Sequence, residues 1–370
     1  MSMFQFEIQL TAAIVAAACA LPGAFLVLRQ MAMMSDAISH AILPGIVVAF
    51  FLTGNLASPL LIAGGAATGL VTVVLVETLR RTGLVREDAA IGLVFPALFS
   101  VGVILIAKFA SDVHLDTDAV LLGEHAFVPF DRWIVFGTDL GPQALYATGV
   151  TGLVCAAFIA CFYKELKLAT FDAALCASLG FMPTLLHYAL MGLISVTAVA
   201  AFDAVGSILV VALMVGPPAS AYLLTDRLDR MILLGVLLGI LAAITGYWVA
   251  HALDVSIAGT MAAMVGVEFG VVTSVAPHRG LVASWRRRRR QKWEFAQRML
   301  TIHLLQHEGR PEDLQESHVG HLQDHLQWEK EFADRVVRMA LQRTLIIEAG
   351  EQLRLTEVGR EVAREAIVHA

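Results

Sequence analysis

Charged residues are scarce in this sequence of 370 residues. Only 16% of the chain is Asp, Glu, Lys or Arg, 58% is hydrophobic, and the mean hydropathy is +0.72. Soluble globular domains usually contain about 25% charged residues. The shortage of charge nearly excludes a soluble enzyme and predicts that most of the chain lies in lipid.

Three other features are missing. The four cysteines form no CxxC pair, which argues against a disulfide framework or a thiolate metal site. There is no GxxxxGK[ST] phosphate loop, so we expect that this chain does not hydrolyse ATP. The N-terminal residues contain Glu7 but no Lys or Arg, unlike a secretory signal, so the apolar run to Leu28 is interpreted as a retained span.

The few charges are unevenly distributed along the chain. Residues 1–277 contain 10 Lys and Arg and 18 Asp and Glu, whereas the last 93 residues contain 16 and 14. This asymmetry indicates two parts in different solvents. We expect a transmembrane domain over 1–280, a basic juxtamembrane linker over 281–292 and a water-exposed domain over 293–370.

Long apolar windows predict an all-α polytopic membrane domain, because a helix needs about 20 mostly apolar residues to cross the hydrocarbon core. The windows cover residues 10–28, 32–53, 59–79, 89–109, 143–163, 184–201, 205–224, 231–250 and 257–276. The sixth and seventh are nearly continuous, so eight to nine complete spans are expected. Interruptions at Pro44–Gly45 and at Gly216–Pro218 are typical of helices beside a transport path, although packing kinks explain each of them equally well.

Basic residues near the span ends predict the orientation of the chain. With the N-terminus outside, most of them fall on the cytoplasmic side, including Arg29, Arg80, Arg81 and the run Arg286–Arg290. We therefore expect a multi-pass membrane protein with a cytoplasmic C-terminal domain.

Asp36 and His40 are the strongest candidates for a functional site. A carboxylate within a span costs about 2.5–3.5 kcal/mol on insertion scales and usually faces the bundle interior or a polar path. The spacing of four places both side chains on one helix face, one turn apart. Carboxylate and imidazole ligands suit manganese, iron or zinc, but two are too few for a closed site, so a second copy would have to supply two more. The alternative is that the two side chains bond one another or neighbouring backbone, with Ser35 and Ser39 as helpers.

Other polar groups in the spans are weaker candidates. Asp203, between the sixth and seventh windows, could line the outer part of a path or serve only structure. His187, His251, Glu77 and Glu268 each stand alone in the sequence. We interpret these four as satisfied or snorkelling groups rather than ligands.

Residues 163–181, YKELKLATFDAALCASLGF, form an amphipathic helical pattern after the fifth span. Such a segment can dock in a groove on a partner or lie at the level of the lipid headgroups.

Six ordered segments resemble the permease subunits of zinc, manganese and iron ABC importers. They are LRQMAMMSDAISHAILPGIVVAFF (28–51), EDAAIGLVFPALFSVGVILI (87–106), LLGEHAFVPFD (121–131), the 163–181 segment, AAFDAVGSILVVALMVGPPASAYLLTDRL (200–228) and DVSIAGTMA (254–262). The resemblance covers about residues 10–280.

The resemblance implies a fold like that of type II ABC importers and a transport complex. Its partners would be a second permease, identical or paralogous, two cytoplasmic ATPase subunits and an external metal-binding protein. It implies that Asp36 and His40 coordinate the metal, that manganese is favoured by the 121–131 loop over zinc or iron, and that no cofactor is permanently bound. It also implies that 163–181 is the coupling helix. Its candidate contact residues are Lys164, Glu165, Leu168, Phe171, Asp172, Leu179 and Gly180.

The C-terminal segment departs from many family members, which end soon after the last span. Its pattern predicts a helix from 293 to 309, a short helix near 312–319, a helix near 329–343, a hairpin turning at Ala349–Gly350 and a closing helix. This is a winged-helix order, and LTEVGREVA (355–363) resembles the end of the wing in regulators of the diphtheria-toxin-repressor type. Nucleic acid is an improbable partner, because lipid attraction already explains the Arg286–Arg290 run and the segment beyond Lys292 is net acidic. A protein-docking or regulatory module is expected instead.

Five histidines in this segment recur at helical spacing, a weak pattern for metal binding without cysteines. They are His303, His307, His318, His321 and His325.

The sequence thus predicts a permease subunit of an ATP-driven importer of a divalent transition metal. Two alternatives remain open. One is a gradient-driven metal transporter in which Asp36 and His40 relay protons. The other is a membrane-anchored, metal-responsive regulator.

Overall fold

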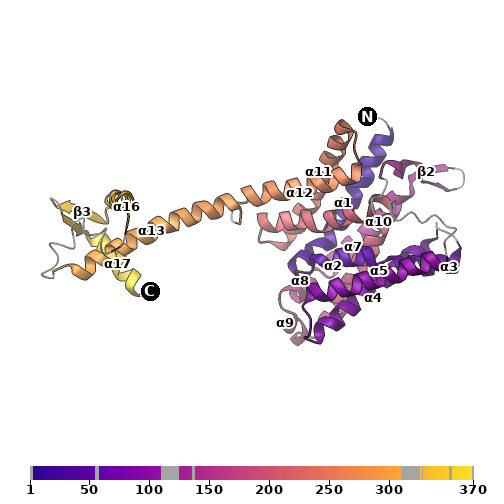
Figure 1. Ribbon diagram of the computed structural model, residues 1–370, viewed down its shortest axis with the longest axis horizontal. Helices are drawn as coiled ribbons and strands as arrows, with labels where there is room; N and C mark the ends of the chain where they lie inside the picture. The colour runs from indigo at the N-terminus through magenta and orange to yellow at the C-terminus, as the bar shows by residue number, and fades with distance from the viewer. Residues whose placement is uncertain are drawn as a thin grey trace. The chain divides into compact units, whose positions relative to one another are not determined.

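The computed structural model describes residues 3–54, 58–109, 125–135, 138–277, 279–309, 326, 328–349 and 352–368. The chain divides into two compact units, Met1–Gly280 and Leu281–Ala370 (Figure 1). Residues 281–292, expected as a linker, belong to the second unit, where they form the first part of a helix.

The first unit is a bundle of long apolar helices. Its helices are α1 (Met3–Leu28), α2 (Ala32–Ala41), α3 (Leu43–Thr53), α4 (Pro59–Arg81), α5 (Glu87–Phe109), α7 (Gln143–Cys161), α8 (Tyr163–Phe171), α9 (Ala173–Ser178), α10 (Pro183–Leu224), α11 (Leu228–Leu253) and α12 (Ile257–Val275). Among the described residues, nine candidate membrane spans are present, with α2 and α3 forming one and α10 supplying two. The polytopic helical fold expected from the apolar windows is therefore confirmed.

Helix α1 lies at the centre of the bundle, where it packs against α7, α10 and α11. Its small residues allow close approach: a Cβ added at Gly23 would lie 1.9 Å from the carbonyl oxygen of Met214 in α10. Three of the four cysteines, Cys19, Cys155 and Cys176, are buried as apolar groups, and all four are free thiols. These observations agree with a lipid-embedded core built from small and aliphatic residues.

The second span is broken where the sequence predicts, just before Pro44. Helix α2 ends at Ala41 and α3 begins at Leu43, with the proline in its first turn. Proline is favoured in the first turn of a helix because its missing N–H has no partner to lose there. Gly45 then brings α3 against α4, since a Cβ at this position would lie 2.1 Å from the carbonyl oxygen of Gly64.

The sixth and seventh spans form one helix, α10, of 42 residues. The expected interruption at Gly216–Pro218 is wrong, because α10 continues through both prolines to Leu224. Tight packing supports this region: a Cβ at Gly216 would lie 2.2 Å from Val265 of α12. The departure from helical geometry occurs instead at Gly206, with φ 77° and ψ 165°, a conformation that favours glycine.

A short hairpin between α5 and α7 is not expected from the sequence. The 3₁₀ helix η1 (His125–Phe130) precedes strands β1 (Arg132–Val135) and β2 (Thr138–Pro142), which pair antiparallel with Arg132 opposite Pro142. Arg132 donates from Nη1 and Nη2 to the two carboxylate oxygens of Glu7 at 3.3 and 3.2 Å. This two-point ion pair ties the hairpin to the start of α1.

The second unit contains helices α13 (Leu281–His307), α16 (Lys330–Gln342) and α17 (Glu357–Val368) and strands β3 (Ile346–Ala349) and β4 (Gln352–Leu355). The strands form an antiparallel hairpin with Ile346 opposite Leu355. The predicted third helix, hairpin and closing helix are confirmed. The helix predicted near 312–319 lies outside the described residues. The apolar core of this unit consists of Ala296, Leu300, Leu304, Val336, Val337, Ala340, Leu345, Ile346, Leu353 and Leu355.

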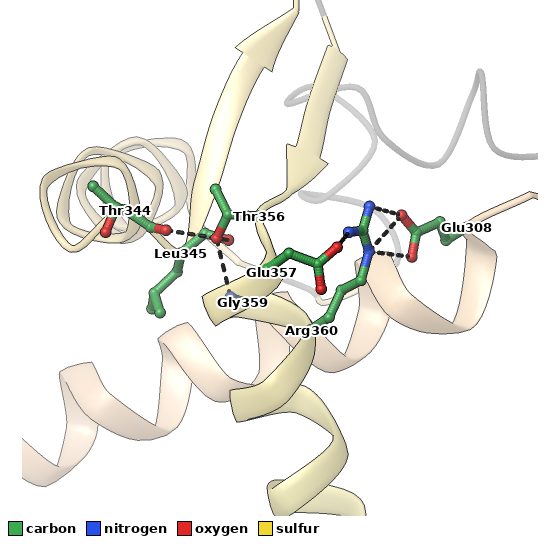
Figure 2. A network of polar contacts seen from close by, with 7 residues as sticks. All are labelled: Glu308, Thr344, Leu345, Thr356, Glu357, Gly359 and Arg360. Atoms are coloured by element: carbon green, nitrogen blue, oxygen red, sulfur yellow. Dashed lines mark hydrogen bonds and ion pairs between the residues drawn. The ribbon is translucent and has the colours of Figure 1, made fainter.

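Polar contacts join the closing helix to its neighbours in the second unit (Figure 2). The hydroxyl of Thr356 donates to the carbonyl oxygen of Thr344 at 2.6 Å and accepts the N–H of Gly359 at 3.0 Å. Thr356 is thus an N-cap that also fastens α17 to the end of α16. Arg360 of α17 donates to the carboxylate of Glu308, just beyond α13, at 2.8–3.1 Å.

Candidate functional site

Asp36 and His40 lie one turn apart on α2, as predicted. Their nearest side-chain atoms, Asp36 Oδ1 and His40 Nε2, are 3.4 Å apart. The side chains are 36% and 27% exposed, whereas the neighbouring Ala37 and Ile38 are fully buried. The acid and the imidazole are therefore accessible polar groups beside fully buried positions of the same helix.

The two serines beside this pair do not assist it. Ser35 Oγ donates to the carbonyl oxygen of Ala32 at 2.8 Å, and Ser39 Oγ donates to that of Ser35 at 2.9 Å. Both hydroxyls are thus satisfied by their own helix. Their suggested role as helpers is wrong, and the carboxylate and imidazole keep free coordination positions.

The surroundings of the pair come from neighbouring helices α4, α5 and α10, which pack against α2. The ring of His40 lies 5.9 Å from the ring of Phe95 in α5. Within the described residues, no group of three or more His, Cys, Asp or Glu side chains could hold a metal ion. One chain therefore offers two ligands at this site, half of the usual four for a tetrahedral ion.

Residues 163–181 fold into two helices rather than the single helix expected. The break is at Asp172, whose backbone is extended (φ −149°, ψ 90°) and whose carboxylate accepts the N–H of Leu175 at 2.8 Å as the N-cap of α9. Leu166 and Cys176 anchor the two helices in the bundle, because both are fully buried. Gly180, with φ 87°, ends the segment.

The opposite face of α8 and α9 exposes large apolar side chains. The exposed residues of this region, which we call the α8–α9 surface, are Phe171, Leu175, Leu179, Phe181, Met182 and Leu185. Of the candidate contact residues, Lys164, Phe171, Asp172, Leu179 and Gly180 are exposed, whereas Glu165 and Leu168 are half-buried. Exposed large apolar side chains of this kind are typical of a protein–protein contact.

Two polar residues that the sequence left isolated are brought together by the fold. Glu77 of α4 and His187 of α10 approach to 3.7 Å between Oε2 and Nε2, and His187 Nδ1 lies 3.0 Å from Nη1 of Arg29. These contacts agree with the interpretation of both residues as polar groups with partners in the protein rather than as ligands. Nothing in the sequence pairs Arg29 with a position 158 residues away.

The remaining polar candidates in the spans are Glu268, His251 and Asp203. Glu268 of α12 is half-buried with no hydrogen bond to its carboxylate oxygens within the described residues, and His251 is exposed beside Tyr247. The side chain of Asp203 lies outside the described residues, although its backbone is part of α10. Close to it, His125 is buried, with Nδ1 2.9 Å from the carbonyl oxygen of Ala204.

Two of the five candidate histidines of the second unit lie within the described residues. The rings of His303 and His307, both in α13, have centroids 4.8 Å apart. The other three candidates, His318, His321 and His325, lie outside the described residues.

A polytopic helical bundle with an accessible acid–imidazole pair in its second span defines a membrane permease. The sequence model of the ABC 3 transport family matches residues 1–276, and the chain belongs to this family.

Relatives with known assignments agree with this family. The zinc transport system membrane protein TroD of Treponema pallidum is 45% identical over 358 residues, covering 97% of each chain. The manganese transport system membrane protein MntD of Bacillus subtilis is 47% identical over 279 residues, which are 75% of this chain and 94% of that protein. The solved structure of PsaBC from Streptococcus pneumoniae in complex with Fab aligns over 75% of this chain and 94% of its own, with 27% identity and a TM-score of 0.62.

Proposed function

We propose that this chain is the transmembrane permease subunit of an ATP-driven importer of divalent transition metal ions, with Asp36 and His40 as ligands for the ion in transit. The observation that carries the proposal is the accessible pair on α2, with 3.4 Å between its nearest polar atoms. An imidazole nitrogen and a carboxylate oxygen are suitable ligands for manganese and zinc.

A second permease copy or paralogue completes the proposed site. Two ligands per chain, related by twofold symmetry, give four around a central path. The exposed fraction of the pair supports this arrangement, because both side chains are accessible from outside the single chain.

Substitution of the carboxylate tests the proposal. Asp36→Asn keeps the side-chain volume but removes the negative charge, so metal uptake by the complete transport complex should fall by about tenfold or more, a typical effect of a perturbed metal site. Asp254→Asn is the matched control: Asp254 has φ 54°, which asparagine also tolerates, and it lies at the C-terminal end of α11. Undiminished uptake by Asp36→Asn at normal membrane levels would contradict the assignment.

The α8–α9 surface is the proposed contact for the two ATPase subunits, and an external metal-binding protein is the proposed donor of the ion. The exposed apolar residues of that surface support the first proposal. Both partners are expected for an ABC importer. The ATPase subunits are needed because the chain has no phosphate loop of its own. We further propose that the N-terminus is outside and the second unit in the cytoplasm of a bacterial cell, which the distribution of Lys and Arg supports.

Manganese is the proposed main substrate, with zinc next. The LLGEHAFVPFD loop and the similarity to MntD favour manganese, whereas the similarity to TroD favours zinc. Iron has no support from the relatives described above. Competition for uptake between manganese and zinc at equal free concentrations, measured with the intact complex, distinguishes the two metals.

A gradient-driven transporter is the competing proposal. It requires that uptake survive removal of every ATPase subunit and collapse with the proton or sodium gradient. Copurification of an ATPase with this chain would argue against it.

The second unit is proposed to be a winged-helix-like regulatory or protein-docking module. The order of helix, hairpin and helix over 330–368 supports this proposal. The coverage of the relatives supports a separate module, because the match to TroD covers 97% of this chain whereas the match to MntD covers 75%. Metal-dependent, sequence-specific DNA binding would instead favour a membrane-anchored regulator.

A further inference from the structure

The turn between α1 and α2 holds a partly buried cation. Arg29 follows the last residue of α1, and Gln30 takes a positive φ of 60°, which turns the chain sharply. The N–H of Met31 donates back to the carbonyl oxygen of Leu26 at 2.9 Å and closes the turn. Helix α2, which carries Asp36, begins at Ala32, directly after this turn, so the position of the turn sets the position of the candidate metal ligands.

Arg29 bridges two other elements with one guanidinium group. Its Nε donates to Oγ1 of Thr170, in the last turn of α8, at 3.2 Å. Its Nη1 lies 3.0 Å from Nδ1 of His187, in the first turns of α10. Because a guanidinium can only donate, Nδ1 must accept, and the neutral ring carries its proton on Nε2.

This tautomer extends the bridge to a fourth element. His187 Nε2 faces Oε2 of Glu77 in α4 at 3.7 Å. The same carboxylate accepts a hydrogen bond from Arg81 at 2.7 Å. The α1–α2 turn, α8, α10 and α4 are therefore joined by one set of polar contacts, which we call the Arg29 network.

Stability of the bundle alone does not explain the Arg29 network. Arg29 has no carboxylate partner of its own within the described residues, and its Nη2 makes no hydrogen bond there. A partly buried cation with an unsatisfied donor is costly for stability alone, and an apolar residue would pack at lower cost. The fork of a guanidinium, unlike the ammonium of lysine, can hold two acceptors in fixed directions at once.

We propose that Arg29 is a positioning residue that transmits movement of α8 to the α1–α2 turn and hence to Asp36 and His40. The inference rests on the proposed role of the α8–α9 surface as the ATPase contact. When α8 is displaced, Thr170 moves with it, and the hydrogen bond from Arg29 to Thr170 transmits the movement to the guanidinium. Because Arg29 belongs to the turn before α2 and also contacts His187, this turn and the first turns of α10 move together.

The test separates ATP hydrolysis from transport in the complete complex, reconstituted in vesicles with its ATPase subunits and external binding protein. In Arg29→Gln, ATP hydrolysis should remain within about twofold of the original while metal uptake per ATP falls by about tenfold, the effect of losing hydrogen bonds to a charged group. Arg29→Lys should restore only part of the uptake. Thr170→Val, which keeps the branched shape of the side chain, should lower uptake per ATP without changing assembly. Arg279→Gln is the control, because Arg279 is an exposed arginine paired with Asp226 at 2.6 Å.

Two results in Arg29→Gln and Thr170→Val would overturn the proposal: no change in either activity, or a fall of uptake and hydrolysis by the same factor. Should Arg29→Gln fail to assemble, Thr170→Val decides alone. Leu175→Asp, on the α8–α9 surface, tests the underlying docking proposal separately. It should abolish copurification of the ATPase, which Arg29→Gln should retain, so a failure of docking is distinguished from a failure of transmission.

Discussion

Two histidines of the membrane unit lie in opposite environments. His40 is 27% exposed and faces Asp36, whereas His125, outside the spanning helices, is only 1% exposed. The ring nitrogens of His125 lie 2.9 and 3.2 Å from the carbonyl oxygens of Ala204 and Ile8. One histidine is therefore available to a ligand, and the other joins η1 to α1 and to the middle of α10.

Replacement of the buried histidine should destabilise the membrane unit. His125→Leu leaves a buried backbone carbonyl group without the ring N–H that donates to it, at a cost of about 1–3 kcal/mol. Thermal unfolding of the detergent-solubilised protein measures the loss. His251→Leu, at an exposed position, should change the unfolding temperature little, and equal effects of the two variants would contradict the structural role of His125.

The same residue should make stability depend on pH. Burial lowers the pKa of His125 from its ordinary 6.5, although the two carbonyl acceptors, which favour the protonated ring, oppose this. The unfolded chain then takes up a proton before the folded one, so stability is lost as the pH falls below about 6.5 toward the lowered folded-state pKa. The difference in stability between the original protein and His125→Leu, measured from pH 8 to about 5, should shrink on acidification. A difference that is constant or grows would contradict this.

At the scale of elements, α10 is distinguished by a single non-helical residue. Gly206 has φ 77° within a helix of 42 residues, whereas the two consecutive prolines nearer its end leave the helix continuous. The local sequence misleads here, because a proline breaks a buried helix only where neighbouring helices do not support it.

Substitution at the non-helical residue should be costly. Gly206→Ala forces a residue with a side chain into a conformation that it rarely adopts, which costs about 1–3 kcal/mol. Gly192→Ala is the matched control in the same helix, since a Cβ there meets no atom within 4 Å and should stabilise the helix slightly. Thermal unfolding of both variants compares them, and a stabilised Gly206→Ala would show that the break is not required.

The cap of α17 gives a local prediction for the second unit. Thr356→Ala removes the hydroxyl that accepts the N–H of Gly359 and donates to Thr344, at a cost of about 1 kcal/mol. Hydrogen exchange in the full chain should show faster exchange of the amides of α17. Thr356→Ser retains the hydroxyl and should preserve the original rates, and loss of protection in both variants would indicate a role for the methyl group instead.

The sequence predicts what depends on local composition. Nine apolar windows identify the spans, Pro44 marks the break between α2 and α3, and the spacing of Asp36 and His40 places them on one face. Contacts between distant helices are not encoded in any local pattern. The Arg29–His187 contact and the break at Gly206 depend on how the helices pack, so hydropathy and spacing could not reveal them.

At the scale of the whole molecule, the chain consists of two units with separate cores. The similarity to MntD covers 94% of that protein but only 75% of this chain, so a membrane unit without the second unit exists among relatives. The family model likewise ends at residue 276, so the second unit lies outside the part of the chain that it matches.

Truncation tests this separation. A chain ending at Gly280 should insert in the membrane, retain the ATPase and keep metal uptake within about twofold, because the first unit has its own core. Uptake and copurification by the truncated and full chains at several external metal concentrations measure the effect. Loss of assembly on truncation would show that the second unit is required for the permease itself.

The length of α10 gives Gly206 a particular importance. A straight helix of 42 residues would measure about 63 Å, roughly twice the thickness of the hydrocarbon core, so the helix must bend to remain in the membrane. Its first turns hold His187, and its middle holds Ala204, the partner of His125. Because α10 supplies two candidate spans, its two ends lie toward the same face of the membrane, and Gly206 is the non-helical residue between the two crossings. Along the backbone, a movement at the His187 end therefore reaches the second crossing only through this glycine.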